Sequence, residues 1–104
     1  MIETDIFKAL ADPTRCAIFE KLVAGRMNAT ALRNGMTISQ PAMSQHLSVL
    51  RNASLVREEK QGRTVNYEVN PDGLALIAAW LAKYRVYWPA RIDALKAMLK
   101  EMDQ

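Results

Sequence analysis

The sequence predicts a mainly helical domain with one small β-hairpin, in the order α-α-α-α-β-β-α. Apolar residues recur at helical spacing in the first half of the chain, and this spacing returns after residue 71. Between these regions, residues 64–69 alternate between polar and apolar side chains, as a half-buried strand does. A short third helix, a tight glycine turn and a serine-capped fourth helix form a helix-turn-helix. With the hairpin that follows, the predicted fold is a winged helix-turn-helix.

Capping residues mark the helices of the first half. We expect helices over residues 4–11, from Asp12-Pro13 to Gly25, from Asn28 to Asn34-Gly35, and from Ser39 to about Ala53. Asp, Asn and Ser are preferred at N-caps because their side chains accept a hydrogen bond from a main-chain N–H of the first turn. Pro13 and Pro41 fall in first turns, where proline removes no helical hydrogen bond.

The second half predicts a hairpin and then a long helix. Residues 55–60 supply the antiparallel partner of the alternating strand, and Gln61-Gly62 supplies the turn. Apolar residues then follow one another at gaps of three and four to the C-terminus, close to a heptad seam. Pro89 should kink this helix or start a new one. We expect one domain over residues 1–104, with a winged core over 4–70 and a dimerisation helix over 71–104.

The composition excludes several classes of protein. A single cysteine, Cys16, rules out an intrachain disulfide framework, and with one histidine, His46, we expect no metal site. There is no catalytic set of nucleophile, histidine and acid and no glycine-rich phosphate loop, so we expect no enzyme, catalytic residue or cofactor. No secretory signal or long apolar run is present, which predicts a cytoplasmic protein that does not contact the membrane.

The placement of charge is more informative than its total of +3. No acidic residue occurs between Glu20 and Glu58. That stretch contains five basic residues, namely Lys21, Arg26, Arg33, Arg51 and Arg57. A one-sided basic stretch indicates a surface for phosphate. The alternative is a chance distribution in a small chain.

The fourth helix divides into an apolar face and a polar face when its residues are spaced by about 100°. The polar face has amides, hydroxyls and one arginine but no acid, and such groups suit base edges and phosphates. We predict DNA contacts from Ser39, Gln40, Pro41, Ser44, Gln45, His46, Ser48 and Arg51. The alternatives are a merely solvated face and, for His46, a half-buried structural histidine bonded to backbone or phosphate.

The tip of the predicted hairpin is basic. Lys60 and Arg63 flank its turn and could reach a phosphate backbone or a minor groove. The alternative is a solvated turn, and the nearby Glu58 and Glu59 weaken any wing contact.

Two runs resemble the ArsR/SmtB family of bacterial winged-helix repressors. Phe7–Arg15, followed by Ala17-Ile18, resembles the opening of that family, and Ile38–Leu50 resembles its recognition helix. Residues 53–67 resemble its wing. The tail from Trp80 to Leu95 is similar to a subgroup related to the autorepressor of the sporulation-delay system.

The resemblance implies a homodimeric repressor of its own or a neighbouring operon. It would bind double-stranded DNA at a palindromic operator until an unidentified signal releases it. The resemblance also implies dimerisation through the first and last helices. The expected interface residues are Ile6, Phe7, Leu10, Leu81, Tyr84, Trp88, Ile92 and Leu95. The alternative for the aromatic residues of the tail is an intrachain core.

The chain departs from its metal-sensing relatives. The third helix has no Cys-x-Cys cluster and the last helix has no histidine, so the familiar arsenic, cadmium and zinc sites are absent. Cys16 stands where relatives often have arginine. It is either a small, partly buried residue or a redox thiol, which would need a second subunit to form a disulfide. The effector stays open between a metal, a small molecule, a thiol oxidant and none. The alternative function is a protein-interaction or dimerisation module that does not bind DNA specifically.

Overall fold

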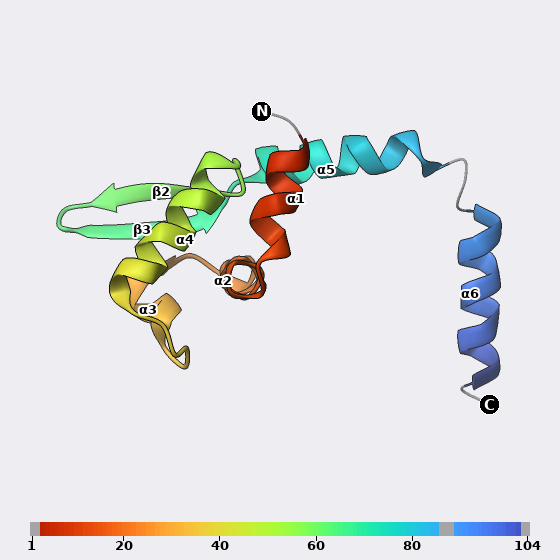
Figure 1. The fold of residues 1–104 in the computed structure, drawn as a ribbon, viewed down its shortest axis with the longest axis horizontal. Coiled ribbons are helices and arrows are strands. Elements are labelled where there is room, and N and C mark those ends of the chain that lie inside the picture. The colour runs from red at the N-terminus through yellow and green to blue at the C-terminus, as the bar shows by residue number, and fades with distance from the viewer. Residues whose placement is uncertain (1–2, 86–88, 103–104) are drawn as a thin grey trace.

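The computed structural model describes residues 3–85 and 89–102 and has the predicted winged helix-turn-helix fold (Figure 1). Its elements are α1 (Glu3–Ala11), α2 (Pro13–Ala24), β1 (Met27–Asn28), α3 (Ala29–Arg33), α4 (Gln40–Asn52), β2 (Val56–Gln61), β3 (Thr64–Val69), α5 (Pro71–Lys83) and α6 (Pro89–Met102). The four helices of the first half and the hairpin thus begin and end close to their predicted positions.

One hydrophobic core joins the first four helices to the root of the hairpin. Helix α4 contributes Met43, Leu47 and Leu50 to it at gaps of four and three residues, all of them buried. The other buried core residues are Ile6, Ala9, Ile18, Phe19, Leu22, Leu32, Ala53, Leu55 and Val56. Burial of each large aliphatic side chain stabilises the fold by about 1.5–3 kcal/mol. This packing holds α4 with one side on the core and the other in solvent.

The predicted N-caps are confirmed by their hydrogen bonds. The Asp12 carboxylate accepts from the main-chain N–H of Arg15 at 3.0 Å. Asn28 and Ser39 do the same for α3 and α4, accepting from residues 31 and 42 at 2.8 and 3.2 Å. Each bond satisfies one donor that the first turn of a helix leaves without a partner.

The sheet has three strands in the order β1-β3-β2, one more than the sequence predicted. In the hairpin, Val56 pairs with Val69 and Gln61 with Thr64, so the two turn residues are Gly62 and Arg63 rather than Gln61 and Gly62. Gly62 has φ +62, which favours glycine. Strand β1 has only two residues and is too short to produce a period-two pattern, which is why the sequence did not predict it.

The start of α5 lies tightly against the end of α4. The main-chain N–H of Gly73 donates to the Ser54 carbonyl at 2.9 Å. A Cβ on Gly73 would lie only 2.5 Å from that oxygen. The close approach therefore requires glycine at position 73 and sets the direction in which α5 leaves the winged core.

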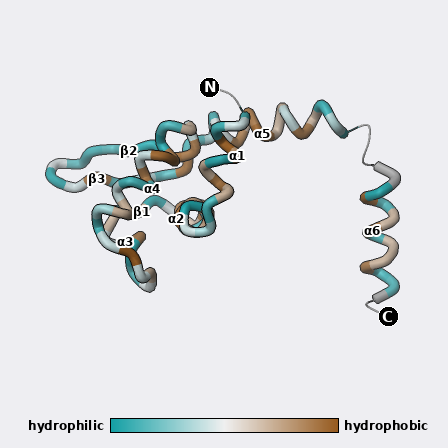
Figure 2. Tube along the Cα trace, in the orientation of Figure 1, coloured by the Kyte–Doolittle hydropathy of each residue, from teal (hydrophilic) through white to brown (hydrophobic). Residues whose placement is uncertain are grey.

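The apolar run after residue 71 forms two helices, so of the two outcomes expected at Pro89, a kink or a new helix, the structure has the new helix. Helix α5 ends at Lys83, and α6 begins at Pro89, where proline is well tolerated because a first turn does not need its N–H. Helix α6 lies apart from the winged core in Figure 1, and residues 91–101 are all exposed. Figure 2 shows hydrophobic residues recurring along both helices. No helix among the described residues is long and apolar enough to cross a membrane.

Candidate nucleic-acid interface

The turn between α3 and α4 is held by two basic side chains from the acid-free stretch. Lys21 on α2 donates from Nζ to the carbonyls of Leu32 and Asn34 at 3.0 and 2.7 Å. These carbonyls lie at the C-terminal end of α3, where a cation is favourable. Arg33 donates from Nε to the Ile38 carbonyl at 3.2 Å. Lys21 thus has a structural role, because it holds the end of α3 and the turn that leads to α4. The sequence did not indicate this role.

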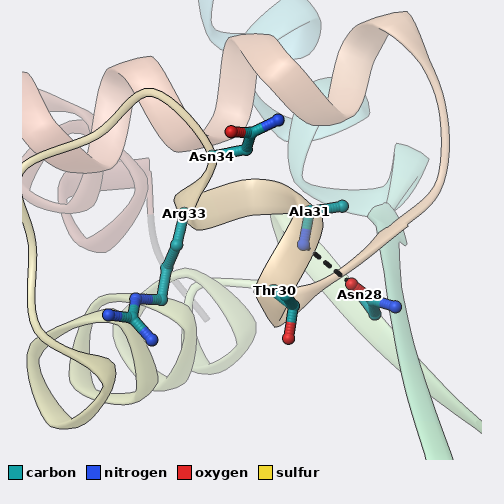
Figure 3. Close-up of a pocket in the computed structure, with 5 residues that line it drawn as sticks. All are labelled: Asn28, Thr30, Ala31, Arg33 and Asn34. Carbon is teal, nitrogen blue, oxygen red and sulfur yellow. Dashed lines mark hydrogen bonds between the residues drawn. The ribbon is translucent and has the colours of Figure 1, made fainter.

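A shallow hollow of about 520 Å³, lined mostly by residues with polar side chains, lies beside α3 (Figure 3). Asn28, Thr30, Arg33 and Asn34 line it, and Figure 3 shows Arg33 and Asn34 pointing to opposite sides of the α3 ribbon. The Asn28 side-chain oxygen and the Asn34 carbonyl already accept hydrogen bonds within the chain. The hollow is therefore the outer surface of the turn, with no converging set of ligand groups.

Helix α4 presents the polar face that the sequence predicted. Six of the eight residues selected on it are exposed, and the other two, His46 and Ser48, are partly buried. Ser39 can serve two roles. Its Oγ caps the helix by accepting from the main-chain N–H of Ala42, and its hydroxyl proton can still be donated to another acceptor. The exposed face carries no carboxylate of its own, so it can approach a polyanion without direct repulsion.

The five basic residues of the acid-free stretch do not form one unpaired cationic surface. Three of them meet acids of the hairpin in space, as the pairs Arg26–Glu59 at 3.0 Å, Arg51–Glu58 at 2.6 Å and Arg57–Glu68 at 2.7 Å. The sequence did not indicate Arg26–Glu59 and Arg51–Glu58 because each joins two different elements, and Arg57–Glu68 depends on the exact register of the hairpin. This corrects the basic-surface prediction: the absence of acids in that stretch of sequence does not mean an absence of acids in space.

The wing tip keeps its charge. Lys60 and Arg63 are exposed, and neither takes part in an ion pair among the residues that the structure describes. Lower on the wing, Tyr67 lies opposite Glu58 in the ladder. Burial raises the pKa of the Tyr67 hydroxyl, and the Glu58 carboxylate raises it further, so the phenol stays neutral. The cationic part of the wing is thus confined to its tip.

Arg15, at the start of α2, is a residue that the sequence analysis did not select for the interface. Its Nη1 lies 3.5 Å from Nδ1 of His46 on α4. Its Nε and Nη2 donate to the carbonyls of Ala9 and Lys8 at 2.8 and 3.3 Å. The two partners of the Arg15–His46 contact are 31 positions apart, so no local pattern could have indicated it.

The expected dimer residues divide into core and surface. Ile6 is fully buried in the chain's own core and Leu10 packs against that core, so Ile6 has no surface to offer a second copy. Phe7 makes an edge-on contact with Trp80 of α5, with ring centroids 5.0 Å apart, and Trp80 lies 4.9 Å from Tyr84. This aromatic cluster joins α1 to α5. Trp88 lies outside the described residues.

The cluster continues into exposed apolar surface on the helices of the tail. Phe7, Leu81 and Tyr84 are 36–39% exposed, which is high for large hydrophobic side chains. On α6, Ile92 and Leu95 are 41% and 56% exposed. Several large apolar side chains exposed along two helices are typical of a protein–protein interface.

Of the sensor sites considered, only the thiol can be located. Cys16 is partly buried on α2, with Sγ 3.9 Å from the Glu20 carboxylate. Over residues 3–85 and 89–102, no group of three or more His, Cys, Asp or Glu lies together as a metal site would need. Neither observation identifies an effector.

Comparisons with known proteins agree on one class. A family model described as a helix-turn-helix domain matches residues 10–59. The HTH-type transcriptional regulator Rv2034 of Mycobacterium tuberculosis is 40% identical over 75% of this chain and 73% of its own length. The arsenical resistance operon repressor of Escherichia coli is 37% identical over 98% of this chain and 86% of its own length.

The chain belongs to the ArsR/SmtB family of transcriptional regulators. Another member, the transcriptional repressor SdpR of Bacillus subtilis, is 31% identical over 77% of this chain and 89% of its own length. A crystal structure of an ArsR family transcriptional regulator matches with a TM-score of 0.74 at 30% identity, covering 82% of this chain and 88% of the other. An ArsR-like regulator from Rhodococcus sp. RHA1 matches with a TM-score of 0.73 at 29% identity, covering 92% and 91%. The protein is thus an ArsR-family DNA-binding regulator and not an enzyme, as the sequence predicted.

Proposed function

We propose that this ArsR-family regulator is a homodimeric repressor of its own or a neighbouring operon in the cytoplasm, released by a signal still to be identified. The observation that carries the proposal is the exposed, acid-free polar face of α4. Amides and hydroxyls on a helix that fits the major groove suit base-edge recognition. Gln40 and Ser44 project from the first turns of this helix, where helix-turn-helix proteins contact bases.

The dimer is supported by the apolar surface that α1 and α5 share. Phe7, Leu81 and Tyr84 would be covered by the same surface of a second copy, since a two-fold interface uses one patch twice. The α6 residues Ile92 and Leu95 would extend that interface. Two recognition helices would then enter successive major grooves about 34 Å apart on a palindromic site.

The wing and the end of α4 would contribute phosphate contacts. Lys60 and Arg63 at the wing tip would contact backbone phosphates, which position a protein without reading sequence. Arg51 would also reach the backbone after leaving Glu58. Gln45, His46 and Ser48 would follow the edge of the same groove, beside Ser39 and Pro41 at the helix start.

The direct test is a gel shift with the DNA upstream of the gene itself. We expect a shifted complex at low salt that weakens steeply as salt rises, because bound phosphates release counterions. The Gln40→Ala and Ser44→Ala variants should lose preference for the operator over random DNA, whereas Arg63→Ala should weaken binding to both equally. A dimer in solution that shifts no promoter-proximal DNA would favour the interaction-module alternative instead.

A further inference from the structure

A groove of about 350 Å³ lies between α2 and the edge of the recognition face of α4. Its lining consists of Arg15, Gln45, His46, Ser48 and Val49. Four of these five side chains carry hydrogen-bond donors, and none is an acid. A second groove of about 390 Å³, lined by residues of α1, shares Arg15 and Val49 with it.

The Arg15 guanidinium is held in position within this groove. Its bonds to the carbonyls of Lys8 and Ala9 attach it to the C-terminal end of α1, and its side chain is only 19% exposed. Because the side chain is already ordered, a ligand would not have to immobilise it on binding. Arginine has five N–H donors, and those on Nη1 and Nη2 not used by the chain can serve a ligand.

The contact with Arg15 favours one tautomer of His46. Arginine has no acceptor atom, so a hydrogen bond across this 3.5 Å contact requires Nδ1 of His46 to accept, which leaves the ring proton on Nε2. The imidazole therefore has its donor on the side of the ring away from Arg15. A carboxylate is nearby, since Oδ2 of Asp12 lies 3.9 Å from Nη1 of Arg15. Asp5 and Lys8 line the neighbouring groove and offset each other.

We propose that this groove binds one phosphate of the DNA backbone, with Arg15 supplying the charge and His46 the Nε2–H donor. The inference rests on the proposed function and names two side chains that position the recognition helix. A phosphate fits because the lining offers donors with net positive charge, and because the N-terminal turns of α2 favour an anion.

Two substitutions of His46 separate binding from structure. In His46→Asn the side-chain oxygen can still accept from Arg15, but no donor reaches the former position of Nε2. In His46→Gln the longer side chain brings an amide N–H there. We expect His46→Asn to weaken binding to the operator and to a random duplex by the same factor, about tenfold, as for a lost hydrogen bond to a charged group. His46→Gln should bind within about twofold of the wild type.

Arg15→Gln tests the charge. It should lower the slope of log K against log salt by about 0.9 per protomer. Arg15 also joins α1 to α2, so thermal unfolding must first show that Arg15→Gln is folded. If it is not folded, the DNA affinity of His46→Asn provides the test.

The single histidine allows a readout that does not depend on affinity, because its ring gives unique NMR signals. The 15N shifts should identify the Nε2–H tautomer in the free protein, and a random duplex should move the Nε2–H signal. Unchanged ring signals, or full affinity of His46→Asn, would overturn the phosphate site. A loss confined to the operator would also overturn it, by assigning His46 to base reading. If the wild type binds no DNA at all, the proposed function itself fails.

Discussion

Replacing Glu58 by glutamine should tighten DNA binding while slightly weakening the fold. Glu58 on β2 receives a 2.6 Å bond from Nη1 of Arg51 at the end of α4. In the free protein this carboxylate neutralises the only arginine on the predicted recognition face, and it would have to separate from Arg51 before a phosphate could take its place. Glutamine keeps the size and an acceptor oxygen but removes the competing charge.

The expected magnitudes follow from exposure. The side chains of Arg51 and Glu58 are 46% and 31% exposed, so solvent screens the pair and its loss should cost less than about 1 kcal/mol of unfolding free energy. If each Arg51 then neutralises one more phosphate, the salt slope should steepen by about 0.9 per protomer, or about 1.8 for a dimer. A fourfold reduction in salt would thereby add about tenfold to the advantage of the variant.

The adjacent residue supplies a matched control. Glu59 is also paired, with Arg26, but successive strand residues point to opposite faces of the sheet. Fluorescence anisotropy with an operator duplex across a salt series should therefore show tighter binding and a steeper slope for Glu58→Gln than for Glu59→Gln, although both variants gain the same net charge. Identical slopes for the two variants would refute the argument that Glu58 holds Arg51 away from DNA.

Three further predictions concern the fold and the dimer. Gly73→Ala should lower the free energy of unfolding in urea by about 1–3 kcal/mol, because its Cβ would lie 2.5 Å from the Ser54 carbonyl oxygen. The control Gly25→Ala, which has open space around it, should be near neutral. Equal losses for the two variants would contradict the close approach at Gly73. Hydrogen bonding from the Arg15 N–H lowers the pKa of Asp12, so its stabilising contribution is present above pH about 4 and is lost as the pH falls through the folded-state pKa. Asp12→Asn, which can still cap α2 but carries no charge, should melt at a lower temperature at neutral pH and show a shallower fall in melting temperature on acidification, so that the two proteins converge at low pH; an unchanged acid profile would refute this role. Leu81→Glu should dissociate the proposed dimer in sedimentation equilibrium, whereas Val23→Glu on the exposed side of α2 should not, and equal behaviour of the two would remove the interface from α5.

The sequence alone determined the elements whose signals are local. Cap residues such as Asp12 and Ser39 act within three positions of themselves, so the starts of α2 and α4 could be predicted without a structure. The polar face of α4 follows from helical periodicity, and its exposure follows from the opposite face being apolar. The alternating strand and its turn predicted the wing, and family resemblance added the class of function, which the comparisons confirm.

Only the tertiary structure decided which groups meet across the chain. It paired Arg51 with Glu58 and placed Arg15 beside His46, because packing of the helices against the hairpin brings together residues that no periodicity relates. It also buried Ile6 and left Leu81 exposed, although both occupy apolar helical positions. Periodicity identifies an apolar face, but only packing shows whether the chain covers that face itself or leaves it for another molecule.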